Sequence, residues 1–578
     1  MNNAGDLTPP LRPAPASPAP SWLRRHRLPL LAGGTVLGLG VASVSAALVL
    51  TAAKPATSVE KMVPANADLM VVVNLDPSVS QKLNLVRVLH RFPQTSSDKA
   101  ISDALDRALK GSGLSYSGDL QPWIGGELGF SARLNFDSTV DKTAGALYAI
   151  SRDDTRARAS LARLRAGAAG RQLTWTDETY SGFQVSVGTP TKSTDQPAAY
   201  SLVDHVVVVA NSVSLLHDII DTEQGRMARL TDSASYKATV SSLPSDRLAL
   251  AYVNGASLVS GIKKQLAQAP AAGSPIRGNI RDLDAFTGIG ASLSASGHGI
   301  NADMLLKLDQ SRLSESTRQA LASPGRPDAV LSWIPRGSDA FIAVGNLNRT
   351  VQSLIDSSKS DPSIKGTTDA LGLTGPAGVL DHLTGDAALE VHVSAGMPAG
   401  ALLLRSDDPA SLRAFFSKLL ATASSLTTGA VPAPRAGRPA AIRMVTTSYQ
   451  GVSITSLVVA TPAQVALVPS YAVLDGFGVL GSNLAEVKAV IDAHRTGVAV
   501  AADPTYKTAR DASLKQPSTI VYLNAGNLLQ AARARSRGTP GATVNDSALA
   551  AAEPVKAVMI TGSSRPGEAY ERLFLLID

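Results

Sequence analysis

The residues best suited to chemistry surround two glycines in the segment Pro122–Glu127, which reads PWIGGE. Trp occurs only four times in the chain, so Trp123 beside Gly126 and Glu127 is a distinctive combination. A ring, a flexible glycine backbone and a carboxylate together can form a small binding site. A tight turn anchored by an aromatic side chain explains the same residues more simply.

A second segment, Asp381–Asp386 (DHLTGD), keeps part of this pattern. It has a glycine followed by an acid, Gly385 and Asp386, but no Trp. If the motif is a site, the loss of Trp predicts that the first copy is the active one.

Two pairs of acids, Asp153-Asp154 and Asp407-Asp408, could bind a cation or act as acid and base. Each pair follows an apolar run and precedes a helical pattern, where Asp commonly caps a helix. No carboxylates at calcium-loop spacing accompany them, so capping is the favoured interpretation.

The chain has eight histidines and no HxH or HExxH pattern. His382 and His392 could be neighbours across strands, but no third ligand is evident, so no metal site is assigned. The chain has no Cys, no GxSxG and no phosphate-binding GxxxxGK[ST]. We therefore assign no catalytic residue and no cofactor.

One GxGxxG pattern begins at Gly476, ahead of a predicted helix. A dinucleotide site needs these glycines between one strand and its helix. Here the stretch Tyr471–Asp492 aligns without a gap with Tyr200–Asp221, in which Gly476 matches His205. Both stretches predict a β-hairpin followed by a capped helix, and not a nucleotide site.

This match is one of six blocks that recur in the same order, beginning with 63–75 and 334–347. Asn74 and Asn346 close these first blocks and are predicted to cap the helices that follow. We therefore expect an α+β fold of two tandem copies, each an antiparallel sheet with helices. The predicted bounds are 60–309 for repeat 1, 310–333 for a linker and 334–578 for repeat 2.

The N-terminal region predicts a membrane address. Residues 1–27 form a Pro/Ala-rich, disordered and basic tail, and residues 28–53 contain no charge. That run exceeds the ~20 residues a transmembrane helix needs. The arginines before it place the N-terminus in the cytoplasm and the bulk of the chain outside. A cleaved signal peptide is the alternative, because small residues at 45–47 and 51–53 would suit a peptidase.

Composition limits the partners. Apolar residues make up 44% and charged residues 17% of the 578, which is typical of a folded chain. The net charge is +7, of which the tail supplies three. No cluster of basic and aromatic residues occurs, so nucleic-acid binding is not expected.

The anchor followed by 64–78 (PANADLMVVVNLDPS), 82–93 (KLNLVRVLHRFP) and 119–130 (DLQPWIGGELGF) resembles a bacterial, membrane-anchored family of unknown function. This is the domain-of-unknown-function family with the number three-three-five-two. The resemblance implies a single-pass extracytoplasmic protein of the cell envelope and supplies no catalytic residues.

Three functions remain open, one of which is a purely structural spacer that predicts neither a pocket nor a cluster of acids and His. The first is a non-catalytic binding or scaffold module that contacts an envelope protein, a glycan or a lipid-like ligand, with exposed aliphatics lining a groove between the copies. The second is an envelope hydrolase with a non-motif active site. A cluster of acids and His with shifted pKa values in one copy alone would favour the hydrolase.

Overall fold

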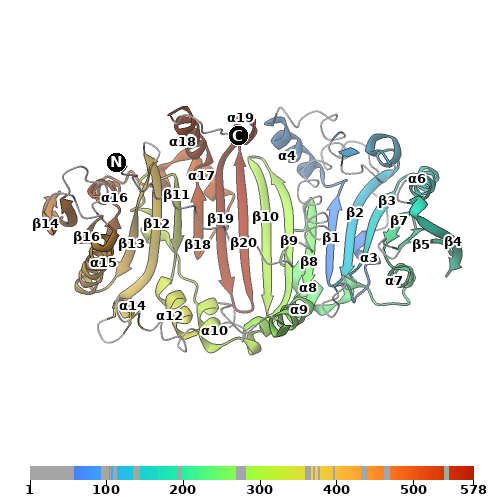
Figure 1. The fold of residues 1–578 in the computed structure, drawn as a ribbon, viewed down its shortest axis with the longest axis horizontal. Helices are drawn as coiled ribbons and strands as arrows, with labels where there is room; N and C mark the ends of the chain where they lie inside the picture. The colour runs from blue at the N-terminus through green and yellow to red at the C-terminus, as the bar shows by residue number, and fades with distance from the viewer. Residues whose placement is uncertain are drawn as a thin grey trace, which may run out of the picture.

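Twenty strands form one antiparallel sheet in the part of the chain that the structure describes (Figure 1). The structure is a computed structural model. It describes residues 58–92, 103, 106–107, 114–134, 143–167, 170–191, 197–268, 282–357, 366, 368, 372–374, 378–394, 397–430, 441–460, 469–538 and 546–578. The predicted α+β class with antiparallel strands is confirmed.

The first ten strands occupy one side of the sheet, in the order β4-β5-β6-β7-β3-β2-β1-β8-β9-β10. Their bounds are β1 (Leu69–Asn74), β2 (Ile124–Arg133), β3 (Ala144–Ser151), β4 (Leu173–Tyr180), β5 (Phe183–Pro190), β6 (Ala198–Val203), β7 (Val206–Ala210), β8 (Ala249–Asn254), β9 (Phe286–Ser296) and β10 (Gly299–Leu308).

The other ten strands continue the sheet from β10 in the mirrored order, β20-β19-β18-β11-β12-β13-β17-β16-β15-β14. Their bounds are β11 (Ala340–Val344), β12 (Leu383–Ser394), β13 (Met397–Ser406), β14 (Ala441–Tyr449), β15 (Val452–Ala460), β16 (Ser470–Leu474), β17 (Phe477–Gly481), β18 (Thr519–Leu523), β19 (Val555–Arg565) and β20 (Glu568–Ile577). Each half thus pairs its strands in the same way, and β10 meets β20 at the seam.

Helices pack on both faces of the sheet. One face, called the α7 face, carries α3 (Val59–Met62), α7 (Val213–Glu223), α8 (Ala234–Val240), α11 (Asp328–Leu331), α16 (Leu484–Thr496) and α17 (Pro504–Asp511). The opposite face, called the α6 face, carries α4 (Val79–His90), α6 (Asp154–Ala166), α12 (Leu347–Ser357), α14 (Val379–His382) and α15 (Pro409–Ala430).

The remaining helical segments connect strands. They are α9 (Gly255–Gln268), α10 (Glu315–Ala322), α18 (Ala525–Gly538), α19 (Asp546–Ala552), the π-helix η1 (Tyr116–Leu120), and the 3-10 turns η2 (Gly170–Gln172), η3 (Leu230–Asp232), η5 (Gln310–Arg312) and η6 (Val500–Ala502). Figure 1 shows helices gathered at the two ends of the central strands and at the flanks of the sheet.

The predicted hairpin-and-helix stretches are confirmed in both halves. In the first half, Asp204 and His205 adopt positive φ between β6 and β7, and Asp475 and Gly476 do the same in the second. Two consecutive positive φ values give the turn whose twist suits a hairpin. Gly476 therefore serves a turn, as the alignment indicated.

The predicted capping by Asn74 and Asn346 is wrong, although another asparagine that follows a strand does cap a helix. Asn254 accepts hydrogen bonds from Ala256 and Ser257 at the start of α9. Asn74 does not cap a helix, because its side chain accepts from Asp76 and α4 starts later, capped by Ser78. Asn346 has positive φ instead and donates to the Ser323 carbonyl.

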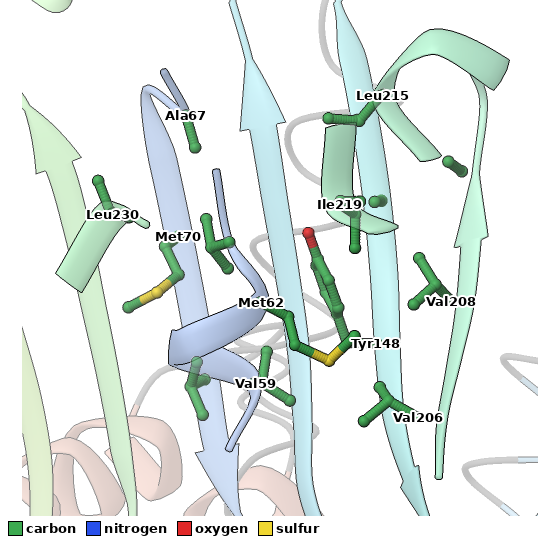
Figure 2. Close-up of a cluster of buried hydrophobic side chains, with 14 of the residues drawn as sticks. Val59, Met62, Ala67, Met70, Tyr148, Val206, Val208, Leu215, Ile219 and Leu230 are labelled. Carbon is green, nitrogen blue, oxygen red and sulfur yellow. The ribbon is translucent and has the colours of Figure 1, made fainter. Parts of the chain in front are cut away.

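The α7 face holds the largest core in each half. Figure 2 shows Val59 and Met62 of α3 next to Tyr148 of β3, close to Ile219 of α7. All four side chains are almost fully buried. Each buried aliphatic side chain of this kind contributes ~1.5–3 kcal/mol. The residues immediately after the predicted membrane span are therefore part of the core.

No helix among the described ranges is long and apolar enough to cross a membrane. The predicted span at 28–53 lies outside those ranges, as does the predicted tail. The predicted linker, 310–333, contributes to the core of the second half through Val330 and Trp333.

Candidate functional site

The PWIGGE motif has a structural role in the fold. Trp123 is buried, and its indole Nε1 donates to the Asp119 carbonyl at 2.6 Å and to Ser160 Oγ at 3.0 Å. Gly126 has φ +70° at an irregularity in the β2–β3 register, and its carbonyl accepts from the N–H of Leu75 at 2.7 Å. The anchored turn is the interpretation that these contacts support.

Glu127 connects this motif to the start of the folded region. Its Oε2 accepts from the Val59 backbone N–H at 2.8 Å and from Ser58 Oγ at 3.2 Å. Burial, followed by the nearby charge of Glu60, raises the pKa of Glu127, although the Val59 and Ser58 hydrogen bonds oppose the rise. The carboxylate thus holds the first turn of α3 against β2.

The second copy of the motif lies in the other half of the sheet. Gly385 has φ +112°, and Asp386 is buried with Oδ2 3.2 Å from Arg405 Nη1. Burial is the main cause of its raised pKa, and Asp328 at the start of α11 adds to it. Gly385 and Asp386 occupy the places in β12 that Gly126 and Glu127 occupy in β2, so the five candidate residues form two separate structural sets.

The acid pairs act mainly as caps. Asp153 accepts from the Arg156 N–H at 3.1 Å, and Asp408 accepts from the Ala410 N–H at 2.8 Å. His382 and His392 are not neighbours: His382 pairs with Asp407 and His392 with Glu486. No group of three or more His, Asp and Glu suited to a metal occurs in the described part of the chain.

The second half contains an acid cluster that sequence reasoning missed. Glu390 of β12 is 1% exposed and accepts from Ser338 Oγ at 2.9 Å. Burial and the nearby charge of Glu486 raise its pKa to about 7. His392 Nδ1 lies 3.1 Å from Glu486 Oε2, so two carboxyls and one imidazole meet between β12 and α16.

The described residues of the first half contain no such cluster at the equivalent place. At the place of Glu390 it carries Ser131, whose hydroxyl is 2.8 Å from the Tyr148 hydroxyl, and Leu215 stands in place of Glu486. The available signal was Glu390 and His392 alternating with apolar residues in one strand (LEVHV). Sequence spacing does not reveal the cluster, because Glu486 lies far along the chain from both.

A hollow of about 230 Å³ adjoins the PWIGGE motif between η1 and α6. Its walls include Trp123, Pro122, Asp119 and Ser160, together with the arginines Arg156 and Arg163 of α6. Hydrogen bonds from Ser115 and the nearby Arg163 guanidinium lower the pKa of Asp119, despite some burial. The hollow therefore presents two cations and one firmly ionised acid.

The centre of the α6 face carries two rows of uncharged apolar side chains, which we call ladders because each member is paired with the next across neighbouring strands. The first ladder consists of Leu147, Phe130, Val71, Ala251, Ala291 and Met304. The second consists of Leu402, Leu389, Ile342, Val521, Ile560 and Leu573.

None of the twelve ladder residues is buried. Leu147 is 57%, Leu389 49%, Ile342 46% and Met304 38% exposed, and the others are partly exposed. The ladders meet at the seam, where Met304 pairs with Glu571 and Leu573 with Ala302. Exposed apolar side chains that lie side by side in this way are typical of interaction sites.

A family model described as "Protein of unknown function (DUF3352)" matches residues 28–431. The chain belongs to this family. The match begins at the first residue of the predicted membrane span and ends just after α15. The resemblance inferred from the sequence is therefore confirmed, and membership assigns no activity.

Other comparisons add little. No curated protein matches the chain. Among solved structures, crystal form III of TP0453 is similar over 46% of this chain and 85% of that chain, with a TM-score of 0.23 and 10% identity. Crystal form I of TP0453 covers 45% and 82%, with the same score and identity. Similarity at this level carries no argument about fold or function.

Proposed function

We propose that this chain is a membrane-anchored, extracytoplasmic binding module that holds the acyl chains of membrane lipids on its two ladders. The proposal rests on the twelve unburied, uncharged side chains of the two ladders, which approach the seam from both sides. Six strands spaced ~4.8 Å apart make each ladder ~24 Å long. One acyl chain in a bilayer spans half of the ~30 Å hydrocarbon core. Each ladder is therefore long enough to hold one acyl chain.

The proposed anchor supports a lipid as the occupant. Residues 28–53 are uncharged and long enough to span a bilayer, and α3 is already docked in the core from Val59. The few residues between them span less than ~20 Å even when extended. The domain is therefore held close to the membrane surface, where lipids are the most abundant apolar ligand.

We also propose that the chain arose by tandem duplication, with repeats at 60–309 and 334–578 and a linker at 310–333. The mirrored order of ten strands in each half supports this proposal. A duplication explains why the ladders are matched, since Ile342 and Val71 occupy equivalent strands.

The proposed membrane orientation rests on the arginines before the span, which favour an N-terminus in the cytoplasm.

The test is native mass spectrometry of the full chain, extracted gently from its own membrane. Wild type should retain lipid, whereas Leu147→Gln and Leu389→Gln, one in each ladder, should retain much less. Val498→Gln is the control, because Val498 is 52% exposed but lies after α16, away from the ladders. A lipid-free wild type, or equal retention by all variants, would disprove the proposal.

An envelope hydrolase is the second candidate, because Glu390, Glu486 and His392 meet the expectation of an acid and His cluster in one half only. Against it, Glu390 and Glu486 are almost fully buried, which leaves little room for a substrate. Hydrolysis of fluorogenic esters and glycosides by the full chain, lost in Glu486→Gln, would support the hydrolase. Equal rates in both would count against it.

A further inference from the structure

The hollow beside Trp123 lies in the first half, and its two arginines are not repeated in the second. Counted from the helix caps, Asp153 for α6 and Asp408 for α15, the second half has Ser411 in place of Arg156 and Lys418 in place of Arg163. The ladders are matched between the halves, but the pair of arginines is not, because only Lys418 keeps a positive charge. This asymmetry separates the hollow from features that merely repeat with the fold.

The hollow has spare hydrogen-bonding capacity. Arg156 contacts Asp153 through Nε, and Arg163 contacts Asp119 through Nη1. A guanidinium has five N–H donors in a planar fork that suits phosphate. Both arginines are well exposed, so each retains donors for a ligand. Asp119 holds Arg163 in place and leaves the lining with a net positive charge.

The hollow lies at the margin of the first ladder. Leu128, Ala149 and Val209 pack against the same buried cluster as Trp123, and Leu147 pairs with Val209 at the end of the ladder. Arg152 follows β3 and donates its N–H to the Trp123 carbonyl, so it marks the level of Trp123. Leu147 lies five residues before Arg152, a distance of ~17 Å along an extended strand. A molecule with an acyl chain on the ladder can place a polar head near the hollow.

We propose that Arg156 and Arg163 bind the phosphate of an anionic phospholipid whose acyl chains lie on the ladders. This assignment rests on the proposed function and specifies its ligand class. Trp123 and Pro122 form the apolar wall of the site, Arg156 and Arg163 supply the charge, and Ser160 and Asp119 fix the shape. The second half has Ser411 and Lys418 at these positions, so it lacks the arginine pair and is assigned no phosphate site.

The test compares two lipids with the same chains, bound to the full chain in neutral detergent micelles. Dioleoylphosphatidylglycerol carries an anionic phosphate, and dioleoylglycerol does not. The double variant Arg156→Gln/Arg163→Gln should weaken binding of the first lipid about tenfold and leave the second unchanged. Arg158→Gln is the matched control, since Arg158 is exposed on α6 but does not line the hollow.

The outcomes separate the two proposals. If binding of dioleoylphosphatidylglycerol falls equally in Arg158→Gln and in the double variant, or falls in neither, the anion site is overturned. Binding of dioleoylglycerol would in that case still support the ladders as a site for acyl chains. If neither lipid binds, the lipid function fails. If inorganic phosphate alone binds wild type and not the double variant, with no lipid effect, the hollow is a site for free phosphate and the lipid assignment is wrong.

Discussion

At the scale of single residues, Glu390 shows how burial and charge combine. Its carboxyl is enclosed between β12 and α16, near the carboxyl of Glu486. A buried carboxylate without a cation favours its protonated form. Glu390 therefore loses its proton near pH 7 instead of near pH 4.5, and this has a measurable consequence for stability.

We expect the stability of the folded chain to fall as pH rises from 4.5 to about 7. The pKa of Glu390 is raised from 4.5 to about 7 on folding, so the folded chain binds more protons in this window. Glu390→Gln should flatten the fall and raise the free energy of unfolding at pH 8 by on the order of 2–3 kcal/mol. At pH 4 the two proteins should be alike.

The measurement is the unfolding temperature of the full chain in detergent from pH 4 to 8. Glu571→Gln is the control, because Glu571 is an exposed acid of the same sheet. The same flattening in the control, or a wild-type profile without the fall, would contradict the account of Glu390.

At the scale of elements, α3 is the connection between the proposed anchor and the sheet. It has only four residues, too short to be stable without packing. Glu127 accepts from the N–H of Val59, the first residue of the helix, and Gly129 of β2 gives the helix room. The short helix therefore depends on two residues of one neighbouring strand.

Gly129→Val should displace α3. A Cβ at Gly129 would lie 2.4 Å from Val59 Cγ1, a contact that the packed helix cannot accept. We expect a loss of 1–3 kcal/mol, within the range of overpacking, and faster amide hydrogen exchange at 59–63. Gly526→Ala is the control, because its Cβ would meet no atom closer than 3.6 Å. Unchanged exchange at 59–63 would refute the docking role.

Local pattern predicted the hairpins and several caps well, because turn and cap chemistry depends on adjacent residues such as Asp204-His205 and Asp153. It failed at Asn74, where the chain turns before the helix and Ser78 takes the capping role. The role of Glu127 in holding α3 was not predictable, because the two lie 68 residues apart. The ladders were also beyond reach, since each draws its six residues from six strands.

At the scale of the whole molecule, the two halves are joined by a single strand pair, β10 with β20. Asp303 of β10 and Arg572 of β20 face each other there, with Arg572 Nε 2.7 Å from Asp303 Oδ1. The Asp303 side chain is fully buried. The two ladders end on either side of this seam, so its rigidity determines whether they form one surface.

Arg572→Leu should destabilise the chain by ~3–5 kcal/mol, because it leaves Asp303 buried without a counter-charge. Asp303→Leu/Arg572→Leu should recover most of that loss, since an apolar pair needs no compensation. Arg318→Ala is the control: its pair with Glu315 is exposed and should contribute less than ~1 kcal/mol. Calorimetry of the full chain in detergent provides the three values. If the double variant is as unstable as the single one, strand geometry rather than buried charge holds the halves together. If the single variant instead melts in two steps, the seam is where the sheet divides.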